Sequence, residues 1–84
     1  MSANAKHLMQ EQHRLVRAEI ARHPVDCGQV QISVSGGTIY LYGKVRPLRT
    51  HEGDFRQALD ILMKALNKIH GIREVTTFWQ ILDS

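Results

Sequence analysis

Three residues that follow the first apolar segment have side chains that could carry chemistry: His23, Asp26 and Cys27. Imidazole and thiolate groups are common ligands of zinc, and a histidine beside a cysteine can activate the thiol as a nucleophile. A structural zinc site normally needs four ligands, however, and the chain has no second cysteine and no close histidine pair. The alternative is a solvated loop with an incidental thiol. We therefore predict neither a metal site nor a catalytic cysteine here.

A second group, His51, Glu52 and Asp54, could supply a pair of carboxylates for acid–base chemistry. Acidic residues are also favoured at the N-terminus of a helix, and a helical pattern begins at this point. We expect this second role. The sequence contains no phosphate-binding loop, dinucleotide fingerprint or nucleophile elbow. These observations predict a protein that is not an enzyme and has no cofactor, and they identify no small-molecule substrate.

Length and composition fit one small folded domain spanning residues 1–84. The chain is 43% hydrophobic and 23% charged, and its 11 Lys and Arg against 8 Asp and Glu give a net charge of +3. That charge is well below the charge of a dedicated nucleic-acid-binding domain. The single cysteine excludes an intramolecular disulfide, and no apolar run has the length of a signal peptide or membrane span. We expect a cytoplasmic location, with association to the cell envelope as the alternative.

An amphipathic helix is predicted over residues 6–22. Asn4 is placed to cap its start, Pro24 prevents its continuation, and residues 1–5 are expected to form a disordered tail. Apolar residues recur on one arc of this helix, whereas basic residues gather on the other side. The apolar residues are Leu8, Met9, Leu15, Val16 and Ile20.

A β-hairpin is predicted to follow, because apolar and polar residues alternate over 30–35 and again over 38–45. Gly36 and Gly37 between them suit a two-residue turn that needs positive φ values. This turn places Val30 opposite Gly43 and makes one face of the hairpin apolar. Gly43 on that face could allow a helix to approach closely. The remaining pairs on the face are Ile32 with Leu41 and Val34 with Ile39.

The second half of the chain predicts a linker, a helix and a strand. Residues 46–50 contain Pro47 and are expected to link the hairpin to a helix over 52–69, which Gly71 ends. Residues 74–82 alternate as a third strand. The order α-β-β-α-β predicts an α+β fold, a two-layer sandwich in which both helices cover one face of a three-stranded mixed sheet. The position of the third strand within the sheet is left open.

Two surfaces of this fold are candidate binding sites. On the sheet face away from the helices, aromatic and polar residues could contact a protein partner, or could stack on single-stranded nucleic acid with Lys44, Arg46 and Arg49 near the phosphates. The alternative is partial burial within the chain itself. This face contains Tyr40, Tyr42, Lys44, Phe78 and Gln80.

The basic side of the first helix is the other candidate, as a contact for an anionic membrane surface. The alternative is an ordinary solvated face. This stripe consists of Lys6, His13, Arg14 and Arg17, with His7 beside them.

The strand and turn pattern from Leu15 to Ile81 resembles the BON domain, a small bacterial α/β module. The resemblance depends on the segments 30–34 (VQISV), 37–45 (GTIYLYGKV) and 70–75 (HGIREV), in which Gly71, Ile72 and Val75 match the motif before the last strand. It implies a phospholipid-surface or protein-association module and carries over no catalytic residues. We therefore predict a non-catalytic, BON-like association module that contacts a protein partner, itself or an anionic phospholipid surface. The alternative is a small single-stranded nucleic-acid-binding domain that uses the open sheet face.

Overall fold

Helices and strands follow one another in the predicted order α-β-β-α-β and form an α+β fold with a mixed sheet. The computed structural model describes residues 2–48 and 53–82, and the side chains of residues 10–48 and 53–82. Neither helix in this part of the chain is long and apolar enough to cross a membrane. The elements are α1 (Ser2–Ala21), β1 (Val25–Ser35), β2 (Thr38–Pro47), α2 (Phe55–Asn67) and β3 (Glu74–Ile81).

The hairpin of β1 and β2 has the predicted register. Val34 pairs with Ile39 and Ile32 with Leu41 in an antiparallel ladder. The turn between the strands is made by two glycines at φ values of 57° and 83°, as a two-residue hairpin turn requires. The third strand, β3, pairs with β2 in parallel, so the strand order is β1-β2-β3. The sequence left this order open.

Both hairpin strands are longer than predicted. Arg46 and Pro47 belong to β2 and pair with the start of β1, so the prediction of a linker from residue 46 is wrong at these two positions. The register shifts between Asp26 and Gln29, where β1 contains a bulge. A bulge interrupts the two-residue alternation from which a strand is recognised, and this is why the sequence pattern missed the first part of β1.

Gly43 lies opposite this bulged region, and the prediction that it allows a helix to approach is wrong. A Cβ atom added at Gly43 would lie 2.1 Å from the backbone oxygen of Gln29 in β1. The backbone φ is +100°, a value that favours glycine. The glycine therefore accommodates the neighbouring strand rather than a helix.

The helix boundaries also differ from the prediction. The first helix begins at Ser2, so Asn4 lies inside it instead of capping it, and residues 2–5 are helical rather than a disordered tail. In α2, Asp54 is the N-cap and the helix ends at Asn67. Gly71 has a positive φ of 88° but lies in the turn that follows, four residues beyond the end of the helix.

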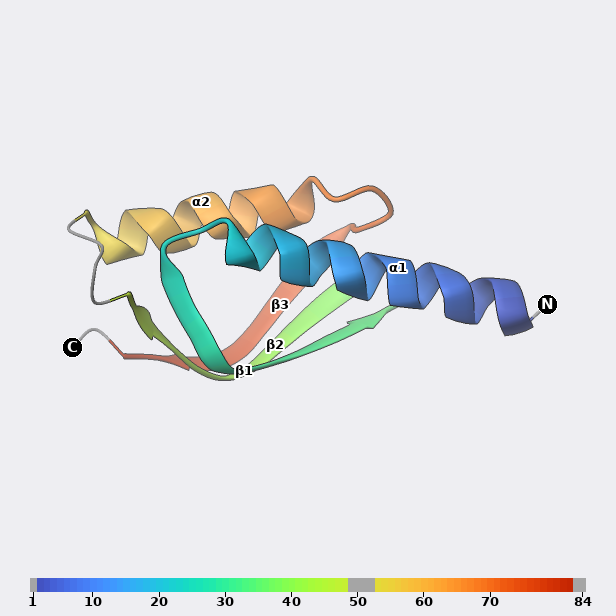
Figure 1. Ribbon diagram of the computed structural model, residues 1–84, viewed down its shortest axis with the longest axis horizontal. Helices are drawn as coiled ribbons and strands as arrows, with labels where there is room; N and C mark the ends of the chain where they lie inside the picture. Colours follow the sequence, from blue (N-terminus) through green and yellow to red (C-terminus); the bar gives the residue numbers. More distant parts are fainter. Residues whose placement is uncertain (1, 49–52, 83–84) are drawn as a thin grey trace.

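The core lies between the sheet and the helices. In Figure 1 both helices lie on one side of the sheet, which curves beneath them. Apolar residues of α1, β1, β2 and α2 form one buried cluster, and the partly buried Val75 and Trp79 of β3 pack against it. The alternation of the strands and the helical spacing of α2 place one face of each element inward. The fully buried members of the cluster are Val16, Ile39, Leu41, Val45, Leu62 and Leu66.

Candidate interaction surface

The sheet face that points away from the buried cluster, which we call the outer face, brings the five predicted residues together. Tyr42 is the partner of Phe78 in the parallel ladder, and Lys44 is the partner of Gln80 one row further on. Tyr40 lies two residues before Tyr42 and therefore points to the same side. The other residues of the face are Gln29, Gln31, Ser33, Ser35, Thr38, Glu74 and Thr76.

An aromatic pair occupies the middle of the outer face. The rings of Tyr42 and Phe78 are stacked, with centroids 5.2 Å apart and an interplanar angle of 12°. Their exposed fractions are 41% and 60%, whereas Tyr40 beside them is half-buried. No described element covers these rings. Stacking fixes their positions before any partner arrives, so a partner that covers them gains apolar contact at a small cost in side-chain entropy.

The charges of the outer face are balanced. Lys44 and Arg46 lie at one end, Asp26 is the register partner of Arg46, and Glu74 lies at the hairpin end. The guanidinium of Arg46 donates to Gln29 Oε1 at 3.5 Å. The hydroxyl of Thr76 donates to Glu74 Oε1 at 3.1 Å and holds this carboxylate along the same face. The net positive charge of the chain is therefore not concentrated around the aromatic pair.

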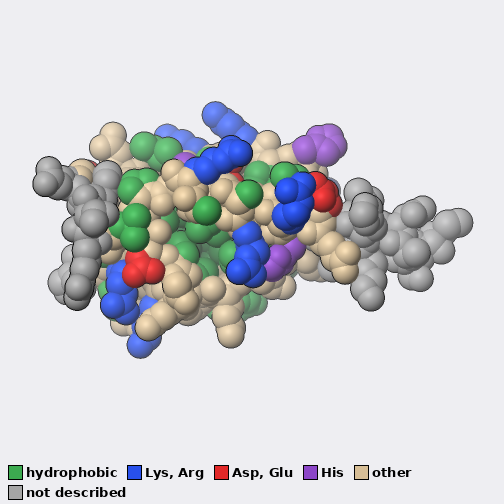
Figure 2. Space-filling view, viewed as in Figure 1, with side chains coloured by type: hydrophobic (Ala, Val, Ile, Leu, Met, Phe, Trp, Pro, Cys, Tyr) green, Lys and Arg blue, Asp and Glu red, His purple; other side chains and the backbone are tan. Residues whose placement is uncertain are grey.

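The predicted basic stripe of α1 does not form a single row of solvated cations. His13 turns toward β1, where its Nε2 lies 3.2 Å from the backbone oxygen of Ile32. Since a carbonyl only accepts, this nitrogen is the donor. Arg14 forms an ion pair with Glu11, and this hydrogen bond raises the pKa of Arg14. Figure 2 shows separate Lys and Arg side chains on the face in view rather than a continuous basic patch.

Of the remaining residues of the predicted stripe, the structure describes the side chain of Arg17. Arg17 is exposed, and no carboxylate pairs with it among the described side chains. The side chains of Lys6 and His7 lie outside the described residues. His13 therefore contacts β1 instead of lying on a fully solvated side of α1, and the stripe as a contact for an anionic surface stays a prediction.

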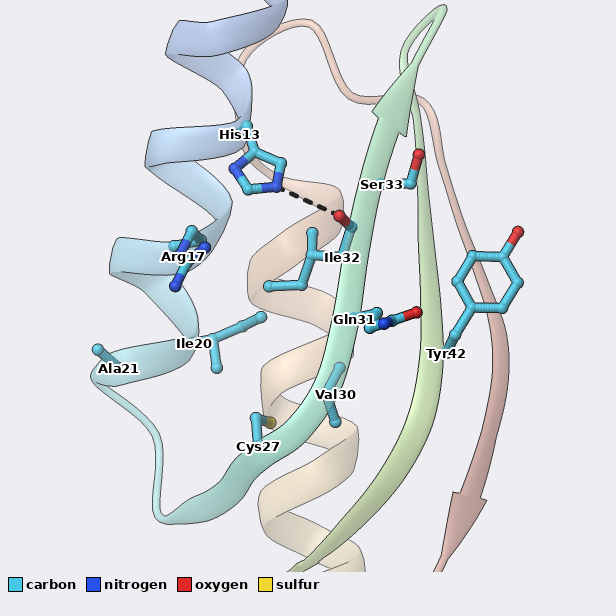
Figure 3. Close-up of a pocket in the computed structure, with 10 residues that line it drawn as sticks. All are labelled: His13, Arg17, Ile20, Ala21, Cys27, Val30, Gln31, Ile32, Ser33 and Tyr42. Carbon is cyan, nitrogen blue, oxygen red and sulfur yellow. Dashed lines mark hydrogen bonds between the residues drawn. The ribbon is translucent and has the colours of Figure 1, made fainter.

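A groove of about 580 Å³ separates α1 from the free edge of β1 (Figure 3). In an antiparallel hairpin, residue pairs that exchange backbone hydrogen bonds alternate with pairs that do not, and Ile32 and Leu41 form a pair of the second kind. The backbone N–H and C=O of Ile32 therefore point away from β2 and into this groove. The ring of His13 forms a hydrogen bond with one of these groups, the carbonyl of Ile32. Its lining is mixed, with apolar residues such as Ile20 and Val30 beside polar ones such as Arg17. The groove is thus a partly protected strand edge.

Cys27 also lines the groove, but it is not an activated nucleophile. Burial raises the pKa of its thiol to about 11, with a further contribution from Asp26. The thiol is therefore protonated near neutral pH. His23 does not line this groove, because its Nε2 lies 2.8 Å from Glu19 Oε2 at the end of α1. The candidate pair of His23 and Cys27 is not assembled.

The remaining chemical candidates have other roles or lie outside the described residues. No group of three or more His, Cys, Asp or Glu residues that could hold a metal ion occurs in the described part of the chain. Asp54 accepts the backbone N–H of Arg56 at 2.9 Å and of Gln57 at 3.4 Å, and so caps α2. His51 and Glu52 lie outside the described residues.

Sequence reasoning missed Glu74 and Thr76 as members of the outer face. The alternation of the third strand already placed Thr76 beside Phe78, and extending that alternation back by two residues would have added Glu74. Comparison with known proteins adds no further assignment: no family model, no curated protein and no solved structure matches the chain.

Proposed function

We propose that the chain is a non-catalytic, BON-like protein-association module and that the outer face is its contact surface. The observation that carries this proposal is the stacked pair of Tyr42 and Phe78, held open at the centre of a polar face. Protein interfaces typically combine an aromatic centre with a polar rim, and the outer face has this composition. The resemblance to the BON domain supports an association role as well.

Charge favours a protein partner over nucleic acid or an anionic membrane. Affinity for nucleic acid depends mainly on neutralising phosphates, and the cations of this face do not outnumber its acids. Lys44 and Arg46 are balanced in number by Asp26 and Glu74. On α1, Arg14 forms an ion pair with Glu11. A balanced surface gains little from an anionic polymer but suits a protein surface of mixed charge.

Site-specific photo-crosslinking tests the proposal. A photoreactive phenylalanine analogue, p-benzoylphenylalanine, would replace Phe78 in cells of the organism that encodes the chain. The matched control places it at Ile61 of α2, which is 50% exposed. We expect a defined protein adduct from position 78 that the control does not give. Equal adducts at both positions, or adducts only to RNA or lipid at position 78, would contradict a protein-association face.

Titration with short single-stranded RNA and DNA at two salt concentrations tests the nucleic-acid alternative. Because phosphate contacts dominate such binding, a nucleic-acid-binding face would give saturable binding at low salt that weakens as salt rises. We expect no saturable binding. Binding that is lost in Phe78→Ala would refute the proposed function.

A further inference from the structure

The charges of the outer face are arranged so that the face complements a copy of itself. Glu74 lies at the hairpin end, as the register partner of Thr38, and Lys44 lies beyond the aromatic pair, as the partner of Gln80. We infer that the partner of the outer face is a second copy of this chain, packed face to face about a two-fold axis. This inference rests on the proposed function and specifies its partner.

The register fixes where such an axis must lie. Rows Thr38–Glu74 and Lys44–Gln80 are equidistant from the row Leu41–Thr77, about 10 Å on either side at 3.3 Å per residue. A two-fold axis that runs across the strands at this middle row reverses the order of the rows. Glu74 of each copy then faces the Lys44–Gln80 row of the other, and Glu74 and Lys44 can pair on both sides of the axis.

The same axis brings the aromatic residues of both copies to the centre. Tyr40 and Tyr42 lie in the rows on either side of Leu41, and their rows exchange across the axis. Each copy thus covers the stacked rings of the other. Two sheets packed in this way lie about 10 Å apart, a separation that long side chains of both faces can span.

The side chains that would pair are available for a partner. Both Glu74 and Lys44 are exposed. The contact of the Glu74 carboxylate is with the neutral hydroxyl of Thr76, which leaves its charge uncompensated. Within residues 10–48 and 53–82, no carboxylate forms an ion pair with Lys44. Pairing across the axis would give each copy two compensated charges around an apolar centre.

The size of the face indicates a weak dimer. Seven rows across three strands cover roughly 23 by 14 Å in projection, from 3.3 Å per residue and 4.8 Å per strand. This is smaller than the ~800 Å² per partner of a standard interface. We therefore expect association that depends on concentration, and we would follow it by sedimentation velocity from about 1 µM to about 1 mM protein.

Charge reversal provides the decisive experiment. The Lys44→Glu variant would place two carboxylates against each other at both contacts, and the Glu74→Lys variant would place two ammonium groups there. Each variant alone should therefore dimerise at least about tenfold more weakly than the original chain. A mixed pair of one Lys44→Glu chain and one Glu74→Lys chain has opposite charges at both contacts, because each contact then joins a carboxylate to an ammonium group. A one-to-one mixture of the two variants should therefore recover the dimer, and so should the double variant in one chain, whose own dimer also has opposite charges at both contacts. Lys68→Glu, at the C-cap of α2, has the same charge change on an exposed residue outside this face and should dimerise like the original chain.

The outcomes separate this inference from the proposed function. The chain could remain monomeric at every concentration and still give a specific adduct to another protein from position 78. This result would refute a second copy as the partner and would still support the protein-association module. If the original chain dimerises but the double charge variant does not, the two-fold arrangement is refuted. No protein adduct from position 78 would overturn both. Circular dichroism of each variant separates loss of association from loss of fold.

Discussion

Replacing Gly43 by alanine tests how closely β1 and β2 approach at the bulge. The Cβ of alanine would lie 2.1 Å from the backbone oxygen of Gln29 and 3.3 Å from the Cα of Val30. The obstructing atoms belong to the backbone, so no side-chain rotation relieves the contact. The residue would also have to adopt a φ of +100° or force the strand to change its path. Both effects destabilise the folded state.

The magnitude follows from these two terms. A left-handed backbone costs an L-residue about 1–2 kcal/mol. Moving packed backbone to admit an extra methyl group costs about 1–3 kcal/mol more. We expect Gly43→Ala to lower the free energy of unfolding by about 2–5 kcal/mol, a large part of the ~4–13 kcal/mol available to a domain of 84 residues. At about 4–8 °C per kcal/mol, the Tm should fall by at least about 8 °C.

Gly36→Ala is the matched control, because it shares the positive φ but not the crowding. Its φ is +57°, and an added Cβ meets no atom within 4 Å. It should cost about 1–2 kcal/mol, from the backbone alone. Urea denaturation followed by circular dichroism measures both variants. If the two lose the same stability, within about 0.5 kcal/mol, the close approach at Gly43 contributes nothing and the reasoning fails.

Three further predictions concern single side chains. Iodoacetamide reacts with the thiolate of Cys27 and not with its thiol. A pKa of about 11 therefore predicts an alkylation rate that keeps rising above pH 9. A rate that reaches a plateau near pH 9 would contradict the burial of this thiol. The neutral thiol is favoured in the folded state, so this contribution to stability is present below pH 9 and lost as pH rises through about 11; Cys27→Ala should lack that loss. His13→Ala should lower the free energy of unfolding by about 0.5–1.5 kcal/mol through its lost bond to β1, whereas Arg14→Ala on the exposed face should change it less than His13→Ala does. Asp54→Ala should cost about 1 kcal/mol as a lost N-cap, more than Asp60→Ala in its exposed pair with Lys64; equal losses in urea denaturation would refute the capping role.

The hairpin could be predicted from sequence because its determinants are local. Alternation of apolar and polar residues fixes which side of each strand is buried, and the glycine pair fixes the turn. Together they leave one register, with Val34 opposite Ile39, and this register is confirmed. Local spacing also predicts an amphipathic helix over 52–69, and the structure has it as Phe55–Asn67.

The bulge, the strand order and the groove depend on contacts between distant segments. The extra residue near Cys27 is stabilised only because β2 continues to Pro47 and pairs with Val25. Neither the start of β1 nor the end of β2 has the alternation of apolar and polar residues that would predict this pairing. His13 shows the same limitation on α1: a helical wheel assigned it to the solvated side, but the free edge of β1 lies close enough for its ring to reach Ile32. The position of a helix over a sheet is not encoded in the wheel.

The self-complementary charge pattern depends on the parallel pairing of β2 and β3. An antiparallel β3 in the same place would bring Glu74 toward the end of β2 that contains Lys44, and the two charges could pair within one chain as cross-strand neighbours. In the parallel register, Glu74 lies beside Thr38, six residues from Lys44 along β2, or about 20 Å at 3.3 Å per residue. Side chains do not span that separation within one sheet. The crossover through α2 therefore leaves an acid and a base at opposite ends of the exposed aromatic pair, where only a second molecule can join them.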